Sequence, residues 1–352
     1  MKAGVITGIN RAEVMEIATP VAGPNELLVR VEACALCTFE QRIFDGTKQV
    51  GLPYLGGHEV AGRIAAVGEG VNPKWELGQK VAVKTLDQCN ECRFCQSGEN
   101  TMCEMVGRSG RRVPEMDGIG GLAEYMLLKP HMLYPLAEGI APEVAALTEP
   151  LACVLHSMDL AKVDFGDTVV VLGAGIMGLL HLQLCRLRGA RVIVAEVDSG
   201  RRARALALGA SEVVHPGEED LVARVRELTG GFGAQAVIVT PAISRLVEQA
   251  VEMVDNLGRI VLFGSFHPDN PLSIRPNKLH YSQIQVFGAV NPGSRDFLRS
   301  SRMLNHGLID LTHYVDSVYP LEQIQEALEE SVKPGTYRVV VTIGPEEETP
   351  EK

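Results

Sequence analysis

The 352-residue sequence predicts an α/β protein in which a mainly β domain accompanies a doubly wound parallel sheet. Two observations support this fold class. The first part of the chain alternates apolar and polar residues in short runs divided by Gly/Pro turns, which is typical of strands. From residue 167 onward, apolar strand patterns alternate with helical patterns, which is typical of a parallel sheet covered by helices. A chain of this length is expected to form about two domains.

The composition limits the classes of function. The formal net charge of -11 argues against nucleic acid as a partner, because phosphate binding favours a basic face. No uninterrupted apolar run approaches the roughly 20 residues that span a bilayer, and residues 1–7 start a strand pattern rather than a signal peptide. We therefore expect a cytoplasmic protein without a membrane partner. Four of the eight cysteines lie within fifteen residues, which favours metal binding over disulfides.

In the first domain, the pattern predicts strands at residues 26–34, 60–67 and 80–83. The first of them leads into Cys34 and Cys37, a C-x-x-C pair. A redox pair of this kind normally belongs to a βαβ unit, whereas this one ends a β run. We therefore interpret Cys37 as a zinc thiolate and Cys34 as a small buried hydrophobe.

A histidine and a glutamate, His58 and Glu59, lie within the glycine-rich stretch 57–71. Cys37 stands twenty-one residues before His58, and Glu149 opens a Glu-Pro-Leu run much further along the chain. For a His-Glu pair alone, a hydrogen-bonded histidine in a turn is the simpler interpretation. Together with a cysteine and a second glutamate, the pair suits a zinc ion that keeps one position free for water or substrate.

Four clustered cysteines predict a second zinc site with a structural role. Gaps of two, two and seven residues separate them, so their sulfurs can surround one tetrahedral ion. A closed shell of four thiolates leaves no position for a substrate. These residues are Cys89, Cys92, Cys95 and Cys103.

The second domain is introduced by a helical pattern at residues 142–160, after which a continuous apolar strand runs into a G-x-G-x-x-G turn. In this turn Gly173 permits the tight bend, Gly175 lets backbone amides approach a pyrophosphate, and Gly178 lets helix and strand pack closely. The helix that follows is expected to end near residue 189. Its first N–H groups, at Ile176 and Met177, would face the phosphates of a dinucleotide.

The next strand, at residues 191–195, ends in Glu196, eighteen residues past Gly178. A carboxylate at this distance accepts hydrogen bonds from the adenosine ribose and repels a 2′-phosphate, which favours NAD over NADP. Arg201 and Arg202 weaken this preference, because two cations attract the phosphate.

Further strand and helix patterns alternate as far as residue 288. Helices at 294–306 and 321–331 and a strand at 337–343 close the chain. The acidic tail at 345–352 is expected to be disordered.

The glycine frame of residues 57–71 resembles the zinc-containing alcohol dehydrogenase signature of the medium-chain dehydrogenase/reductase family. The four-cysteine loop and the glycine turn follow in the family's order, so the resemblance covers essentially the whole chain. It implies a chaperonin-10-like (GroES-like) catalytic domain at 1–144 and 289–352, with a structural zinc lobe at 87–105, and a Rossmann domain at 145–288. It also implies a homodimer or homotetramer.

The resemblance implies a second, catalytic zinc. Glu149 stands where the sorbitol and threonine dehydrogenase branch carries glutamate and the alcohol dehydrogenases carry cysteine. Cys37, His58 and Glu149 would then hold the ion, with Glu59 as a fourth ligand or as a partner of a ligand. Whether Glu59 or Glu149 is the third ligand stays open. The ion would lower the pKa of the substrate oxygen, and hydride would pass to the nicotinamide.

The segment after Cys37 departs from the family. Where members carry a hydroxyl residue and then a histidine of the proton relay, this chain has Phe39 and Arg42. Thr38, Glu59 and water remain as candidate proton acceptors.

Two basic features allow an anionic substrate. Arg42 is interpreted either as a holder of a phosphate or carboxylate group or as a surface ion pair with Glu40 or Asp45. The basic run at residues 108–112 is interpreted as a solvated loop, with anion binding as the alternative.

The sequence thus predicts a zinc-dependent oxidoreductase that transfers hydride between NAD and a secondary alcohol, such as a polyol, a sugar or a sugar derivative. Residues 277–281, followed by Gly288, also resemble sugar- and polyol-acting members. One alternative is a threonine or amino-alcohol dehydrogenase on the same scaffold. Another is a non-catalytic dinucleotide-binding module with a decayed proton relay. The four-cysteine loop disfavours a zinc-free quinone reductase.

Overall fold

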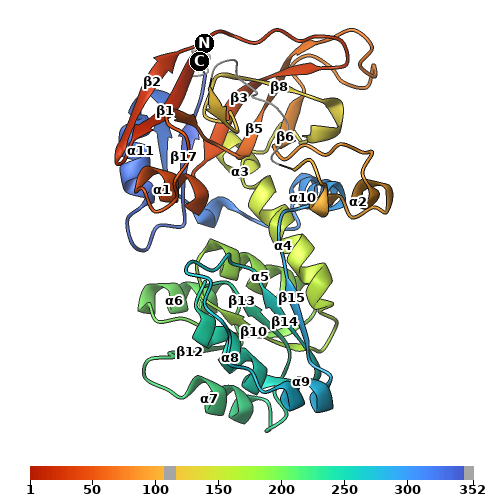
Figure 1. The fold of residues 1–352 in the computed structure, drawn as a ribbon, viewed down its shortest axis with the longest axis vertical. Coiled ribbons are helices and arrows are strands. Elements are labelled where there is room, and N and C mark those ends of the chain that lie inside the picture. The colour runs from red at the N-terminus through yellow and green to blue at the C-terminus, as the bar shows by residue number, and fades with distance from the viewer. Residues whose placement is uncertain (107–115, 345–352) are drawn as a thin grey trace. The chain divides into compact units, whose positions relative to one another are not determined.

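The structure is a computed structural model in which residues 1–106 and 116–344 are described. The chain forms two compact units, the first made of Met1–Ala152 and Gly293–Lys352 and the second of Cys153–Pro292. Figure 1 shows the two units and labels most of the helices and strands. The basic run at 108–112 and the acidic tail at 345–352 lie outside the described residues.

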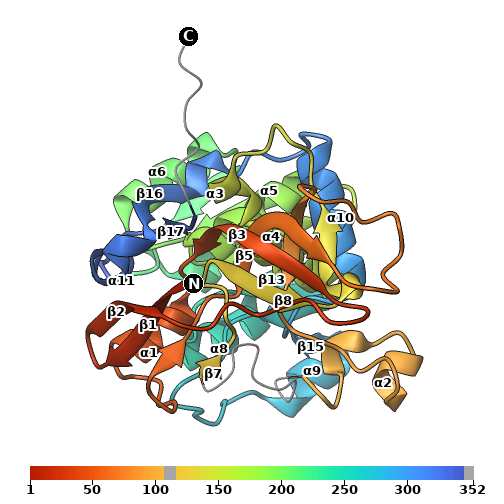
Figure 2. The same ribbon diagram turned by 90° about the horizontal axis from the view of Figure 1, so that it is seen from above.

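The first unit is built on a seven-stranded sheet, as the alternating patterns predict. Its central strands β3 and β5 run antiparallel side by side (Figures 1 and 2), and β3 buries alternate side chains on one face. The sheet order is β16 (Val315–Pro320), β17 (Arg338–Thr342), β3 (Leu27–Ala35), β5 (Glu59–Val67), β6 (Lys80–Lys84) and β9 (Leu133–Pro135), with β8 (Tyr125–Leu128) paired to β3. The closing strand of the chain therefore lies beside one of the first.

A four-stranded sheet completes the β core of this unit. Its order is β2 (Arg11–Glu16), β1 (Lys2–Gly8), β4 (Tyr54–Leu55) and β7 (Asp117–Gly118). One continuous cluster of buried apolar side chains joins the two sheets and includes Val5, Val29, Leu122 and Val341. The mainly β domain predicted from the opening patterns is confirmed.

Helices and 3-10 turns connect the strands of the first unit. They are α1 (Thr38–Phe44), α2 (Arg93–Gln96), α3 (Pro142–Ala145), α4 (Thr148–Ala161), α10 (Ser294–Asn305) and α11 (Ile324–Ser331), with short 3-10 turns η1 (Asn100–Met102), η2 (Pro130–Met132), η3 (Thr312–Tyr314) and η4 (Leu321–Gln323). The helix predicted at 142–160 is thus divided in two, and the boundary between the compact units falls inside α4. The stretch Pro142–Ala161 is long and apolar enough to cross a membrane, but 67% of its most apolar window is buried inside the protein, as in a core helix.

The second unit contains the predicted doubly wound sheet. All six strands are parallel, in the order β12 (Glu212–Val214), β11 (Arg191–Ala195), β10 (Thr168–Leu172), β13 (Ala234–Val239), β14 (Val254–Leu262) and β15 (Gln285–Gly288). Numbered along the chain this is 3-2-1-4-5-6, the Rossmann order. The central strand β10 is buried at four of its five positions, which explains its unbroken apolar sequence.

Five helices connect these strands: α5 (Ile176–Leu187), α6 (Ser199–Ala207), α7 (Leu221–Leu228), α8 (Ser244–Met253) and α9 (Pro276–Ser282). The sequence patterns did not indicate α6, because its arginine-rich turns bury only Ala205. Asp198 begins this helix by accepting a hydrogen bond from the Arg201 amide at 2.7 Å.

Candidate metal centres and cofactor loop

Three predicted zinc ligands meet where α1 and β5 begin. Cys37 is the residue before α1, His58 precedes β5, and Glu59 is the first residue of β5. The Cys37 sulfur, a His58 ring nitrogen and a Glu59 oxygen all lie within 4.8 Å of one another. Sulfur, nitrogen and oxygen donors in this combination are a set that zinc accepts. The donor chemistry therefore fits the ion that the sequence implies.

Glu40, which is fully buried in α1, orients His58. Its Oε1 lies 2.9 Å from His58 Nδ1 and accepts from the Gly57 amide at 3.0 Å, while Oε2 accepts from the Cys37 amide at 3.2 Å. A hydrogen bond at Nδ1 leaves Nε2 as the nitrogen for a metal. Burial opposes ionisation of Glu40, but its contacts with His58 and the Gly57 amide lower its pKa overall. Glu40 therefore stays a carboxylate and holds the imidazole in place.

Arg338, the first residue of β17, neutralises Glu59. Its Nε donates to Glu59 Oε2 at 2.9 Å and its Nη2 to Glu59 Oε1 at 2.8 Å, and both side chains are buried. Arg338 Nη2 also lies 3.6 Å from the Cys37 sulfur. Burial alone would lower the pKa of Arg338, but the charges of Glu59, Cys37 and Glu149 raise it. Both Glu59 oxygens are engaged, which favours Glu59 as a partner of the site over a free fourth ligand.

Among the described residues, Glu149 is not part of the cluster formed by Cys37, His58 and Glu59. It lies in the first turn of α4, and its carboxylate acts on Arg338 through charge. Glu149 therefore lies close enough to Arg338 to interact with its charge, but it does not belong to the cluster of predicted ligands.

The residues that follow Cys37 occupy different environments. Thr38 is exposed, and Phe39 is half-buried with its ring edge-on to His58 at 5.9 Å between centroids. Arg42 is also half-buried. The ion pair of Arg42 with Glu40 or Asp45, one of the two interpretations of this residue, is not formed: Glu40 binds His58, and Asp45 accepts from the Thr47 amide and hydroxyl.

Sequence reasoning did not assign Glu40 and Arg338 to the site. The position of Glu40 in the sequence could have indicated its role, because it stands three residues after Cys37, in the turn that presents the sulfur. The position of Arg338 could not, because 279 residues separate it from Glu59 and only the pairing of β17 with β3 brings the two together.

The four predicted cysteines of the lobe form the second cluster. The sulfurs of Cys89, Cys92, Cys95 and Cys103 lie within 4.8 Å of one another. Backbone amides point at them: the Cys92 amide donates to the Cys89 sulfur at 3.3 Å, and the Met105 amide to the Cys103 sulfur at 3.4 Å. Such N–H donors stabilise thiolates, and the pKa of Cys92 is lowered to about 6, first by backbone hydrogen bonding with Glu104. The cluster has the composition of a closed zinc site.

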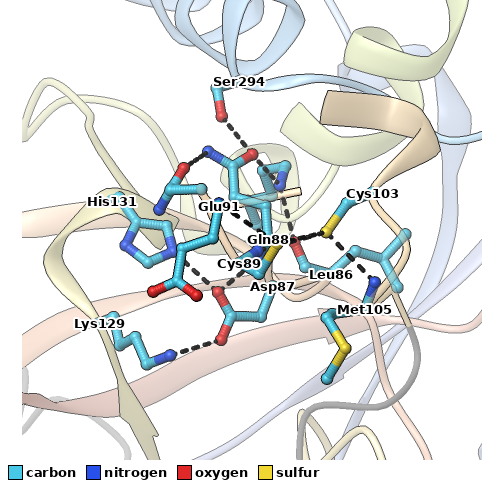
Figure 3. Close-up of polar contacts among 12 residues, drawn as sticks. Leu86, Asp87, Gln88, Cys89, Glu91, Cys103, Met105, Lys129, His131 and Ser294 are labelled. Atoms are coloured by element: carbon cyan, nitrogen blue, oxygen red, sulfur yellow. Dashed lines mark hydrogen bonds and ion pairs between the residues drawn. The ribbon is translucent and has the colours of Figure 1, made fainter. Parts of the chain in front are cut away.

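A polar network anchors the start of this lobe to the first unit. Figure 3 shows Asp87 between Lys129, at 3.0 Å, and His131, at 2.8 Å. Next to it, the Gln88 side-chain oxygen accepts from the Ser294 hydroxyl at 3.0 Å and from Lys84 at 3.2 Å. The lobe therefore begins from a fixed position on β6 and α10.

The glycine turn between β10 and α5 has the geometry that a dinucleotide requires. Gly173 has φ +88°, and a Cβ on Gly178 would stand 1.9 Å from the Gly173 carbonyl oxygen, so both positions need glycine within the protein's own packing. A Cβ on Gly175 would meet nothing within 4 Å. Since the fold itself does not require glycine there, the open space at Gly175 fits close approach by a pyrophosphate. Ile176 and Met177 begin α5, as predicted.

Glu196 follows β11 and binds the glycine turn. Its Oε2 accepts from the Ala174 amide at 2.7 Å, and its Oε1 accepts from the Val197 amide at 2.8 Å. Arg202 Nη1 is directed to the backbone oxygens of Glu196 and Val197 at 2.9 and 2.6 Å. The Arg201 amide donates to Asp198, the residue before α6, and the Arg201 side chain is half-buried.

Two family models match this chain. The model described as "Alcohol dehydrogenase GroES-like domain" matches residues 23–138, and the model described as "Zinc-binding dehydrogenase" matches residues 177–305. The first match contains the predicted zinc ligands except Glu149, together with the four-cysteine lobe. The second contains Glu196 and only the last two residues of the glycine turn, Met177 and Gly178.

Individual relatives span nearly the whole chain. D-arabitol-phosphate dehydrogenase of Enterococcus avium is 27% identical over 350 residues, which cover 97% of this chain and 96% of the relative. L-threonine 3-dehydrogenase of Pyrococcus horikoshii is 30% identical over 325 residues, which cover 90% and 91%. Among solved structures, a putative zinc-binding dehydrogenase of Sinorhizobium meliloti bound to NADP has a TM-score of 0.87 at 26% identity and covers 97% of this chain and 98% of that chain.

Proposed function

The chain belongs to the zinc-type medium-chain dehydrogenase/reductase family and is an alcohol oxidoreductase, and from this premise we propose a specific activity. It transfers hydride between NAD and a secondary alcohol of a polyol or sugar derivative, in a site that holds a catalytic zinc. The observation that carries the proposal is the convergence of Cys37, His58 and Glu59 within 4.8 Å. A module without chemistry has no use for an incomplete ligand set that a substrate oxygen can complete.

Each residue of the proposed site has a separate role. Cys37, His58 and Glu149 would hold the catalytic zinc, and the bound ion supplies Lewis-acid activation of the substrate oxygen. Glu40 fixes the imidazole through the 2.9 Å contact to Nδ1. Arg338 holds Glu59 in place through two short hydrogen bonds. Cys89, Cys92, Cys95 and Cys103 would hold the second, structural zinc.

The route of the substrate proton follows from what the candidate acceptors contact. Glu59 is buried and has both oxygens on Arg338, which disfavours it as the acceptor. Phe39 carries no proton-accepting group. Thr38 is exposed at the start of α1, and we propose that it passes the proton to water.

NAD is proposed as the cofactor. The Glu196 carboxylate lies at the end of β11, where it would accept from the ribose hydroxyls and repel a 2′-phosphate. Arg202 Nη1 is engaged by backbone oxygens, which reduces its capacity to attract that phosphate. The similarity to a structure bound to NADP makes a direct comparison of the two cofactors part of the test.

The substrate class is proposed from the relatives. One is named for D-arabitol-phosphate, and another, L-galactonate-5-dehydrogenase of Escherichia coli at 28% identity, for a sugar acid. The similarity to L-threonine 3-dehydrogenases keeps an amino-alcohol substrate as the second candidate. We further propose a cytoplasmic homodimer or homotetramer. The two compact units, divided after Ala152 and after Pro292, would be its catalytic and dinucleotide-binding domains.

The first test measures NADH formation by the purified protein with NAD or NADP. The panel contains polyols, sugar phosphates, sugar acids and threonine, each with and without a chelator. We expect two zinc ions per chain, turnover of a polyol or sugar derivative with NAD, and loss of that turnover on chelation. Turnover of threonine alone would select the amino-alcohol alternative. A zinc content of one per chain with no turnover would contradict the proposal and support the non-catalytic module.

A further inference from the structure

We propose that Lys48 and Arg42 form a phosphate-binding subsite beside the catalytic centre, so that the substrate is a phosphorylated polyol. This inference rests on the proposed function, because it names the substrate class of the same site. It is carried by the position of two cations that have no carboxylate partner among residues 1–106 and 116–344.

The first cation is Lys48. Its ammonium lies 5.0 Å from the centroid of the Phe39 ring, over the ring face. The same ring stands edge-on to His58, one of the proposed zinc ligands, at 5.9 Å between centroids. The lysine charge and a proposed metal ligand therefore contact the same aromatic side chain. That spacing suits a short sugar chain with its reacting hydroxyl at one end and an anion at the other.

The second cation is Arg42, on the same helix as Phe39. The Arg42 backbone oxygen accepts from the Lys48 amide at 2.7 Å, so the loop after α1 turns back and brings the backbones of the two basic residues together. Among the residues that the structure describes, neither side chain has a hydrogen bond or an ion pair. The neighbouring carboxylates have other partners, Glu40 with His58 and Asp45 with Thr47.

Tyr54, the aromatic neighbour of Phe39, adds no charge of its own. Tyr54 packs against Phe39 at 6.3 Å between centroids and is buried. Burial, followed by the charge of Glu40, raises its pKa to about 12, so the phenol stays neutral. In a chain with 44 acidic and 33 basic residues, two adjacent unpaired cations are a local positive field that attracts an anion. Two cations match a phosphate dianion better than a single carboxylate.

The test compares a phosphorylated and a neutral polyol of the same carbon skeleton, ribitol 5-phosphate and ribitol. The variant Lys48→Gln removes one cation and Arg42→Gln the other. Lys74→Gln is the matched control, because Lys74 is also exposed and also lies 5.0 Å over an aromatic ring, that of Trp75. We expect each subsite variant to lower the ratio of kcat/KM for phosphate over neutral substrate by about tenfold or more. The control should keep the wild-type ratio.

Direct binding keeps this inference separate from the proposed activity. Calorimetric titration of the zinc- and NAD-loaded protein with ribitol 5-phosphate needs no turnover. We expect binding that weakens about tenfold in Lys48→Gln and that weakens with added salt. If no substrate is turned over but this pattern holds, the proposed reaction fails and the subsite stands. An unchanged ratio together with unchanged binding in both variants would overturn the subsite. A preference for ribonate over ribitol 5-phosphate would overturn phosphate in favour of a carboxylate.

Discussion

The buried pair of Arg338 and Glu59 sets the charge balance at the proposed catalytic site. Cys37, Glu59 and Glu149 bring negative charge to the surroundings of one guanidinium, and each of them raises its pKa. A buried ion pair of this kind adds little net stability, but removing one partner leaves the other as an uncompensated charge. Replacing one residue of the pair is therefore expected to destabilise the protein far more than replacing both.

Replacing Arg338 tests this expectation. In Arg338→Gln the Glu59 carboxylate loses both of its short hydrogen bonds, and we expect the free energy of unfolding to fall by about 3–5 kcal/mol. The double variant Glu59→Gln/Arg338→Gln removes both charges and should recover part of that loss. Urea unfolding of the three proteins measures both effects. A loss below about 1 kcal/mol in the single variant would contradict the role assigned to Arg338.

At the residue scale, residues that lie close together in the chain could be assigned to a common site from the sequence. Contacts between residues far apart in the chain could not. The four lobe cysteines and the His58-Glu59 pair could be predicted from the sequence, because the members of each group lie close together in the chain. The role of Glu40 required knowledge of its burial. The partner of Glu59 required knowledge of which strand closes the sheet, and a pattern of apolar residues does not specify that neighbour.

At the scale of the element, the turn from β10 into α5 separates two uses of glycine. Gly178 is required by packing, because a Cβ there would collide with the Gly173 carbonyl oxygen. Gly175 precedes α5 with φ -68° and ψ -179°, a conformation that any residue adopts, and its Cβ would meet open space. The two positions therefore predict opposite phenotypes.

We expect Gly175→Ala to keep its stability within about 0.5 kcal/mol of wild type while NAD binding weakens at least tenfold. Gly178→Ala should instead lose about 1–3 kcal/mol of stability, because the added methyl group forces the turn apart. Thermal unfolding and NADH fluorescence titration distinguish the two. Equal NAD affinity in wild type and Gly175→Ala would mean that the pyrophosphate does not approach this glycine.

Predictability also differed between elements. The strands β10 and β11 were read within a residue or two, because their apolar runs are continuous and buried on both faces. The helix expected at 142–160 is interrupted between α3 and α4, where Ala146 and Leu147 are as apolar and buried as the flanking turns. No apolar periodicity marks that interruption. The helix α6 was missed for the opposite reason, since it buries a single side chain.

At the scale of the whole molecule, a buried histidine is expected to contribute to the acid limit of stability of the second unit. His181 in α5 is fully buried, with Nδ1 2.7 Å from the Met177 oxygen and Nε2 2.8 Å from the Ser157 hydroxyl. Burial lowers its pKa from 6.5 to about 4. The neutral form is therefore the folded form, and protonation favours unfolding.

The pH dependence of stability follows from the difference between the pKa of His181 in the unfolded chain, 6.5, and in the folded protein, about 4. Above pH 6.5 the residue is neutral in both states and contributes no pH dependence. Between pH 6.5 and about 4 the unfolded chain takes up a proton that the folded chain does not, so stability falls by about 3 kcal/mol. We expect urea unfolding of wild type to lose that much more stability between pH 7 and 4 than His181→Gln. Parallel pH profiles for the two proteins would exclude His181 as the cause.

The order in which the chain is synthesised gives the late position of β17 a further consequence. Glu59 leaves the ribosome 279 residues before Arg338, a delay of roughly 14–56 s at about 5–20 residues per second. During that interval the whole of Cys153–Pro292 is made, and it can fold while the seven-stranded sheet still lacks β17. The Glu59 carboxylate, which lies beside the proposed metal ligands, therefore has no Arg338 counter-charge until translation is nearly complete. The proposed catalytic centre is therefore expected to assemble only at the end of translation, whereas the four-cysteine lobe is complete in sequence once Cys103 has been added.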